Sequence, residues 1–223
     1  RILEFAFSNC NYLISVNIPD SIMEIGRKAF YNCGNLSNIS IPKYVVNIES
    51  NVFSRCSSLE NIDVFEKNFY FASENGILYD IEKKRLIKYP EGRKEKEHTI
   101  KDGVIFIDEN SFSNVDAIEK VVFPKTVELI KERAFECCKN LKQVTINSNI
   151  INIGDNAFAL CRKLSKLTIE YGVKSLGSNV FDHCIGLKEV FIPDTVETIG
   201  EMAFNNCKEL KDITLSSRLN EIN

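Results

Sequence analysis

The stretch VFDHCIGLKEVFIPDTVETIG, residues 180–200, decides the fold because its pattern returns every 23 residues along most of the chain. Its landmarks are a phenylalanine, a cysteine three residues later and a leucine three residues after the cysteine. We call the residues at one place in successive repeats a column. The cysteine column contains Cys10, Cys33, Cys56, Cys138, Cys161, Cys184 and Cys207. The phenylalanine column contains Phe7, Phe30, Phe53, Phe112, Phe135, Phe158, Phe181 and Phe204, and Val115 replaces the cysteine after Phe112. A fixed period of this length indicates a solenoid of stacked coils.

The repeat also predicts the elements of one coil. Residues 187–192 fit the repeat pattern L-x-x-V-x-I, whose β-branched residues two positions apart favour a short strand that buries Val190 and Ile192. Pro193 follows, where a missing amide donor ends the strand pairing. Residues 201–206 are too few for a full helix, so a single helical or 3₁₀ turn is expected there. We therefore predict an α/β repeat solenoid of the right-handed leucine-rich-repeat type, mostly β with short helical or 3₁₀ turns, in a single domain over residues 1–223.

The cysteine column is expected to lie in the core. Unpaired cysteine behaves as a small hydrophobic residue, and no clustered cysteine pair of the kind that binds zinc is present. No metal or cofactor is therefore predicted, and successive thiols are not expected to form disulfides. Cys137 lies outside the column, is expected to point outward and is the candidate reactive thiol. The predicted core ladder contains Phe30, Cys33, Leu36, Phe158, Cys161 and Leu164.

The spacing breaks once, at about residues 65–102. Phe53 and Phe112 are 59 residues apart, thirteen more than two repeats. Residues 74–80 and 85–90 predict a β-hairpin with its turn at residues 81–84. Residues 91–101 are rich in charge and are expected to form a solvated loop, with partner binding as the alternative. Six aromatic residues crowd this region and are expected to serve mostly the packing of the hairpin, with a few as exposed anchors of an interface: Phe65, Phe69, Tyr70, Phe71, Tyr79 and Tyr89.

The repeat resembles the BspA-type leucine-rich repeat, for example from Ala29-Phe30 through Cys33 and Leu36 to Ile41-Pro42. The hairpin resembles a longer repeat variant of the same family. The resemblance implies a surface or secreted protein, of the kind found in bacteria and some protist parasites, that adheres to host proteins and to other cells.

Composition and motifs exclude several classes of function. The formal net charge is −3, which is not typical of a nucleic-acid binder, and no apolar run is long enough to enter a membrane. His98 and His183 are the two histidines of the chain, and neither has the partners of a catalytic triad, so no enzyme activity is predicted. No signal-peptide pattern follows Arg1, so we expect the chain to be a fragment of a longer protein.

A partner is expected on the outward columns of the strands, because residues that flank a buried pair in a strand face outward. The candidate protein-binding face contains Lys120, Val122, Gln143, Thr145, Lys166, Thr168, Glu189 and Phe191. The alternative is an ordinary solvated sheet face. Val122 and Phe191 are apolar where a solvated face predicts polar residues.

Two hypotheses of function remain. The first is a surface or secreted protein that binds host or cell-surface proteins in adhesion. The second is an intracellular structural or assembly module that associates with itself through open solenoid ends. A column of reduced cysteines is typical of a reducing compartment, whereas the family resemblance implies the cell surface.

Overall fold

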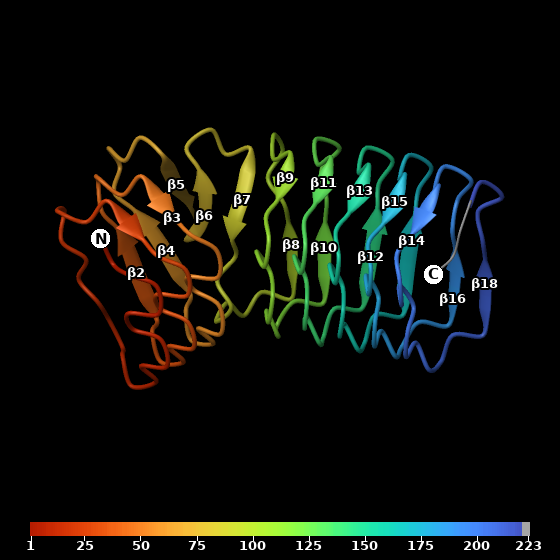
Figure 1. Cartoon of the computed structure of the whole chain (residues 1–223), viewed down its shortest axis with the longest axis horizontal. Coiled ribbons are helices and arrows are strands. Elements are labelled where there is room, and N and C mark those ends of the chain that lie inside the picture. The colour runs from red at the N-terminus through yellow and green to blue at the C-terminus, as the bar shows by residue number, and fades with distance from the viewer. Residues whose placement is uncertain (220–223) are drawn as a thin grey trace. The chain divides into compact units, whose positions relative to one another are not determined.

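The alternating apolar residues of each repeat form short strands that pair with the next repeat. The computed structural model describes residues Arg1–Leu219, and the chain divides into two compact units. Unit 1 contains residues 1–93 and 110–115, and unit 2 contains residues 94–109 and 116–223. Figure 1 shows the successive coils by their strands. Each unit is described separately below.

Unit 2 has parallel strands on two sides of each coil. The first sheet contains β8 (Glu97–Thr99), β10 (Lys120–Val122), β12 (Gln143–Ile146) and β14 (Lys166–Ile169), and β16 (Glu189–Phe191) pairs with β18 (Asp212–Thr214). The second sheet contains β9 (Phe106–Ile107), β11 (Leu129–Ile130), β13 (Asn152–Ile153), β15 (Ser175–Leu176) and β17 (Thr198–Ile199). In both sheets each residue pairs with the residue one repeat later, as Gln143 does with Lys166 and Asn152 with Ser175.

Unit 1 combines parallel coils with an antiparallel insertion. β2 (Asn38–Ile41) pairs with β4 (Asn61–Val64), and β1 (Glu24–Ile25) pairs with β3 (Asn47–Ile48), both in parallel. The insertion contains β5 (Phe71–Glu74), β6 (Ile77–Asp80) and β7 (Arg85–Lys88), which are antiparallel. Residues 81–84 connect β6 to β7. An additional turn at Asn75-Gly76, with φ of 51° and 74°, connects β5 to β6, and the sequence analysis did not include it.

The expected solvated loop over residues 91–101 is wrong in two places. Residues Glu97–Thr99 form β8, which pairs in parallel with β10. The Glu91 side chain is only 1% exposed and binds the Lys88 ammonium at 3.1 Å. A carboxylate can be buried here because a cation and a backbone amide, that of Arg55 at 2.9 Å, satisfy it.

Aromatic rings stack along the core of each unit. In unit 1 the ring centroids of Phe7 and Phe30 are 5.2 Å apart. In unit 2 those of Phe135 and Phe158 are 5.0 Å apart with an interplanar angle of 2°. The core ladder residues Phe30, Cys33, Leu36, Phe158, Cys161 and Leu164 are all fully buried. The period of the sequence thus places one identical set of side chains above the next.

The predicted helical turns are wrong, and so is the α/β class. Between Arg1 and Leu219 there is no helix, hence none that could cross a membrane. Eight coils each have two residues of positive φ, four positions apart, which we call the first and second left-handed positions. They are occupied by Phe5 and Asn9, Lys28 and Asn32, Asn51 and Arg55, Asn110 and Asn114, Arg133 and Cys137, Asn156 and Leu160, Asn179 and His183, and Met202 and Asn206. A left-handed residue interrupts the right-handed helical backbone, so the segment forms consecutive turns and the fold is an all-β solenoid.

Candidate protein-binding surface

The strands of the first sheet of unit 2, together with β16, which contacts β14, bring the predicted face together. Along each strand alternate side chains point outward, which gives a surface that we call the outer face. Its columns are Lys120, Gln143, Lys166 and Glu189, and Val122, Thr145, Thr168 and Phe191. Gln143 pairs with Lys166 and Thr145 pairs with Thr168 in register. Equivalent side chains of successive coils therefore lie next to one another at the spacing of paired strands, about 4.8 Å.

Charge changes along the outer face. Lys120 and Lys166 lie on β10 and β14, and Lys120 is 3.6 Å from the Glu97 carboxylate. Glu189 on β16 pairs in register with Asp212 on β18, so two carboxylates are neighbours at that side of the face. A partner would thus meet a basic part on the first sheet and an acidic part on the neighbouring β16–β18 pair.

An exposed aromatic pair stands on this polar surface. The side chains of Phe191 and Tyr171 are 50% and 61% exposed, and their ring centroids are 6.3 Å apart. Phe191 lies on β16, between threonines of its column, while Tyr171 lies in the turn after β14. Val122 is also exposed, at 39%, but it lies three coils away from Phe191 in the repeat.

Tyr171 was not among the predicted residues of this surface. The signal was present, because the same column holds Lys125, Ser148, Asp194 and Ser217 in other coils of unit 2. Gly172 follows with φ of 147°, and a Cβ atom there would overlap the Ser148 carbonyl oxygen. The glycine therefore lets this turn lie against the preceding coil and fixes the place of Tyr171.

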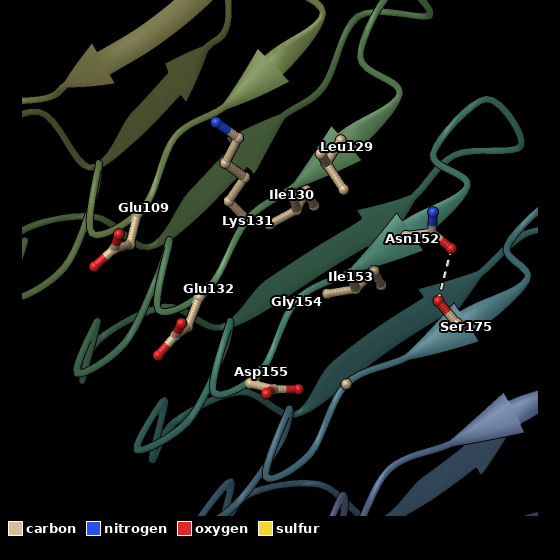
Figure 2. A pocket seen from close by; sticks show the side chains of 11 residues that line it. Glu109, Leu129, Ile130, Lys131, Glu132, Asn152, Ile153, Gly154, Asp155 and Ser175 are labelled. Atoms are coloured by element: carbon tan, nitrogen blue, oxygen red, sulfur yellow. Dashed lines mark hydrogen bonds between the residues drawn. The ribbon is translucent and has the colours of Figure 1, made fainter.

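A second concave surface lies on the other sheet of unit 2. Figure 2 shows this groove of about 470 Å³, which crosses β11, β13 and β15. Gly154 and Gly177 line it, and a Cβ atom at either would lie 2.6 Å from the backbone of the preceding coil. The depression exists because the coils approach most closely where these residues have no side chain.

The groove has polar walls and no catalytic arrangement. The Ser175 hydroxyl donates to the Asn152 side-chain oxygen at 2.6 Å, as the dashed line in Figure 2 shows. Glu109, Glu132 and Asp155 form an acidic column at one side, and the Asp155 carboxylate already accepts the Ser178 amide at 2.7 Å. The groove is open, and its acids serve turns and neighbouring side chains.

The thiols form an ordered column inside the coils. The Cys161 thiol donates to the Phe135 carbonyl oxygen of the preceding coil at 3.2 Å. Burial raises the pKa of the Cys56 thiol to about 12 and that of Cys207 to about 11. Cys10 is exposed, and Cys137 is partly exposed at a second left-handed position, with φ of 61°. The buried thiols of the column, whose pKa is raised, are poor nucleophiles because little of the thiolate form is present at neutral pH.

Metal ligands and catalytic groups do not converge in the part of the chain that the structure describes. No three His, Cys, Asp or Glu residues between Arg1 and Leu219 are placed to hold a metal ion. His98 lies on β8 rather than in a loop. His183 contacts the carboxylate of its neighbour Asp182 at 2.8 Å, and Cys184 next to it is buried.

The repeat matches the family model described as "BspA type Leucine rich repeat region", in six copies over residues 1–82 and 105–223. No curated protein sequence matches the chain. Several solved structures are similar to it. A leucine-rich cell surface protein from Faecalibacterium prausnitzii has 30% sequence identity and a TM-score of 0.88, over 97% of this chain and 57% of that one. A leucine-rich repeat protein from Eubacterium ventriosum has 26% identity and a TM-score of 0.86, over 94% of this chain and 60% of that one.

The pneumococcal vaccine antigen PcpA is more distant. It has 25% identity and a TM-score of 0.65, over 92% of this chain and 51% of that one. The chain thus spans between half and about 60% of the length of these three proteins.

Proposed function

Because the chain belongs to the BspA-type leucine-rich repeat family, we propose that it acts at a cell surface or after secretion, where it binds other proteins in adhesion. The repeat is a structural scaffold of a kind that generally binds proteins through its extended sheet surface. The name of the Faecalibacterium protein, which includes the words cell surface, and that of the pneumococcal antigen support the location.

The exposed pair Tyr171 and Phe191 is the observation that supports a binding surface most directly. Two large rings on a polar sheet leave apolar area in water, and aromatic residues dominate the energetics of protein interfaces. Lys166 and Glu189 beside the pair would set the orientation of the partner, because charges at the rim of an interface contribute mainly specificity. The partner is therefore expected to present an apolar pocket with charges of both signs around it.

The location is tested by labelling intact cells of the source organism with an antibody to this chain. Labelling of intact cells supports the proposal. A signal that appears only after permeabilisation contradicts it and redirects the search to intracellular partners.

The surface is tested by substitution within its own columns. Phe191→Thr introduces the residue that β12 and β14 carry in this column, so it should not disturb the sheet. Ile151→Thr removes a comparably exposed apolar side chain outside the outer face and serves as the control. On immobilised extracellular-matrix proteins and host cells, Phe191→Thr should reduce adhesion while Ile151→Thr does not. Equal adhesion of both variants and the parent would contradict the outer face as the site.

A further inference from the structure

A chain of cations and aromatic rings runs over the turns of unit 1. We call Phe5, Arg27, Lys28, Tyr31 and Arg55 the cation–aromatic ridge. The Lys28 ammonium lies 5.7 Å from the centroid of the Phe5 ring and 5.2 Å from that of Tyr31. The Arg55 guanidinium lies 5.6 Å from the Tyr31 centroid, and that of Arg27 lies 5.9 Å from the Phe5 centroid. Two rings thus alternate with three cations.

The charges of the ridge are only partly neutralised. Arg27 is paired with Glu4, 2.6 Å away. Lys28 and Arg55, in contrast, form no ion pair with any residue between Arg1 and Leu219; each is placed over the ring of Tyr31 instead. In unit 2 the chain pairs such cations with an acid one coil away, as Lys142 with Glu119 at 2.6 Å.

Lys174 is paired in the same way with Glu197, at 3.2 Å. Two neighbouring cations without an acid repel one another. A bound anion would remove that repulsion.

The backbone holds both cations in place. Lys28 and Arg55 occupy the first and second left-handed positions of their coils, with φ of 55° and 62°. The Arg55 amide donates to the Glu91 carboxylate at 2.9 Å, and that carboxylate is buried and paired with Lys88. Tyr31 has serines before and after it in its column, Ser8 and Ser54, which leave room for the long side chains beside its ring. The ridge is thus built on a rigid support, which lowers the entropy lost on binding.

We propose that the cation–aromatic ridge binds a sulfated glycan chain. Guanidinium and ammonium groups bind sulfate oxygens by charge-assisted hydrogen bonds. The exposed ring of Phe5 offers an apolar surface for the C–H face of a sugar ring. Next to the ridge the Asn32 amide donates to the Asn9 side-chain oxygen at 2.8 Å, and such amides suit sugar hydroxyls.

The observations favour a glycan over other polyanions. The formal net charge of the chain is −3, and Glu4 is paired with Arg27 of the ridge. A dense polyanion such as a nucleic acid would therefore be attracted by Lys28 and Arg55 but repelled by the acidic groups around them. A glycan chain carries its sulfates at intervals and presents hydroxyls and ring faces between them. This site is separate from the outer face of unit 2 and does not depend on the function proposed there.

The test removes both charges without changing the backbone. Asparagine occupies the first left-handed position in other coils as Asn51 and the second as Asn32, so Lys28→Asn with Arg55→Asn should keep the turns intact. The control is Arg133→Asn, which makes the same change at a first left-handed position of unit 2, where Glu132 lies 3.4 Å from the guanidinium. Circular dichroism and melting of all variants check the fold.

The probe is a fluorescein-labelled heparin oligosaccharide, followed by fluorescence anisotropy at physiological ionic strength. The parent and Arg133→Asn should bind equally, and the double variant should bind about tenfold or more weakly, since it loses two charge-assisted hydrogen bonds. Tyr31→Ser should also weaken binding, because its column tolerates serine but the ring that orders both cations is lost. Binding of the double variant at parental affinity, or no binding by the parent, overturns the proposal.

Competition identifies the class of ligand. Chemically desulfated heparin should not displace the probe. Displacement by polyglutamate or by duplex DNA as effectively as by heparin, or equal binding to phosphatidylserine vesicles, would overturn the assignment to a glycan.

Discussion

Replacement of Cys161 by alanine tests how the coils are joined. The Cys161 thiol is fully buried and donates to the Phe135 carbonyl oxygen of the preceding coil at 3.2 Å. The same bond recurs from Cys33 to Phe7, Cys56 to Phe30, Cys184 to Phe158 and Cys207 to Phe181, at 3.1 to 3.3 Å. Each of these thiols therefore has a second role besides filling the core: it is an additional donor to a carbonyl group of the preceding coil, as the Phe135 carbonyl also accepts the Cys138 amide at 3.2 Å.

The expected loss has two parts. Removing the donor leaves a carbonyl oxygen buried without this partner, which costs about 0.5–1.5 kcal/mol. Removing the sulfur atom from a packed column leaves a small cavity and costs about 1 kcal/mol more. We expect Cys161→Ala to lower the free energy of unfolding by about 2 kcal/mol in total.

The assay is urea unfolding followed by far-ultraviolet circular dichroism, with Cys10→Ala as the control because Cys10 is exposed. The midpoint should fall for Cys161→Ala at an unchanged slope, and the control should match the parent. Cys161→Ser separates the two parts, since serine keeps a donor but is smaller and more polar. A Cys161→Ala midpoint equal to that of the control would refute the reasoning, and a serine variant no better than alanine would assign the loss to packing alone.

Three further predictions concern the thiols and the glycines. In the native state a thiol reagent such as Ellman's should modify Cys10 rapidly and Cys161 only after unfolding; prompt reaction of Cys161 would contradict its burial. Burial raises the pKa of Cys56 from 9.0 to about 12, so the folded state retains a proton that the unfolded state releases. Its contribution to stability is complete below pH 9 and is lost as the pH rises towards 12, by up to about 1.4 kcal/mol per pH unit; Cys56→Ala should flatten this alkaline decline in urea titrations. Gly177→Ala should lower the free energy of unfolding by about 2 kcal/mol or more, because the new Cβ would lie 2.6 Å from the backbone of Asp155. Gly34→Ala, whose nearest contact would be 3.8 Å, should have little effect on the melting temperature.

The first sheet could be predicted because its strands are long enough to show a period of two. In β12 the buried Val144 and Ile146 alternate with the less buried Gln143 and Thr145, and the sequence alone indicates that alternation. The second sheet was missed because its strands have two residues. A pair such as Thr198–Ile199 shows no alternation, and only stacking on the next coil makes it a strand.

The helical turns were predicted wrongly because a spacing of three or four apolar residues fits a helix as well as consecutive turns. The information that separates them lies in the polar residues. Asn156 and Asn179 occupy first left-handed positions, and asparagine tolerates that conformation better than other residues with a side chain. The column nevertheless also contains Arg133 and Met202, so asparagine is a preference that can be seen only when the columns are aligned.

The surface sites show a similar division. Phe191 could be identified because it is apolar in an outward column. Tyr171 lies in a turn, where the period of two of a strand does not predict whether a side chain points outward or into the core. Glu91 appeared to belong to a charged loop because its partner Arg55 is 36 residues away in the sequence. Contacts between different columns of different coils follow from the stacked structure and not from the repeat itself.

The repeat provides control substitutions, because a residue from one coil can be placed at the equivalent position of another. Such substitutions separate an effect on function from an effect on folding. Residues in one column share a backbone conformation, so an exchange between coils changes the side chain and little else. Arg55→Asn or Phe191→Thr therefore tests a surface with a residue that the fold already accepts at that place, whereas alanine at the same positions would also test the turn or the strand. If adhesion depends on Phe191 and glycan binding depends on Arg55, each exchange should weaken one activity and spare the other, because the two residues belong to different units. Loss of both activities by one exchange would instead indicate that stability, rather than a local surface, had been changed.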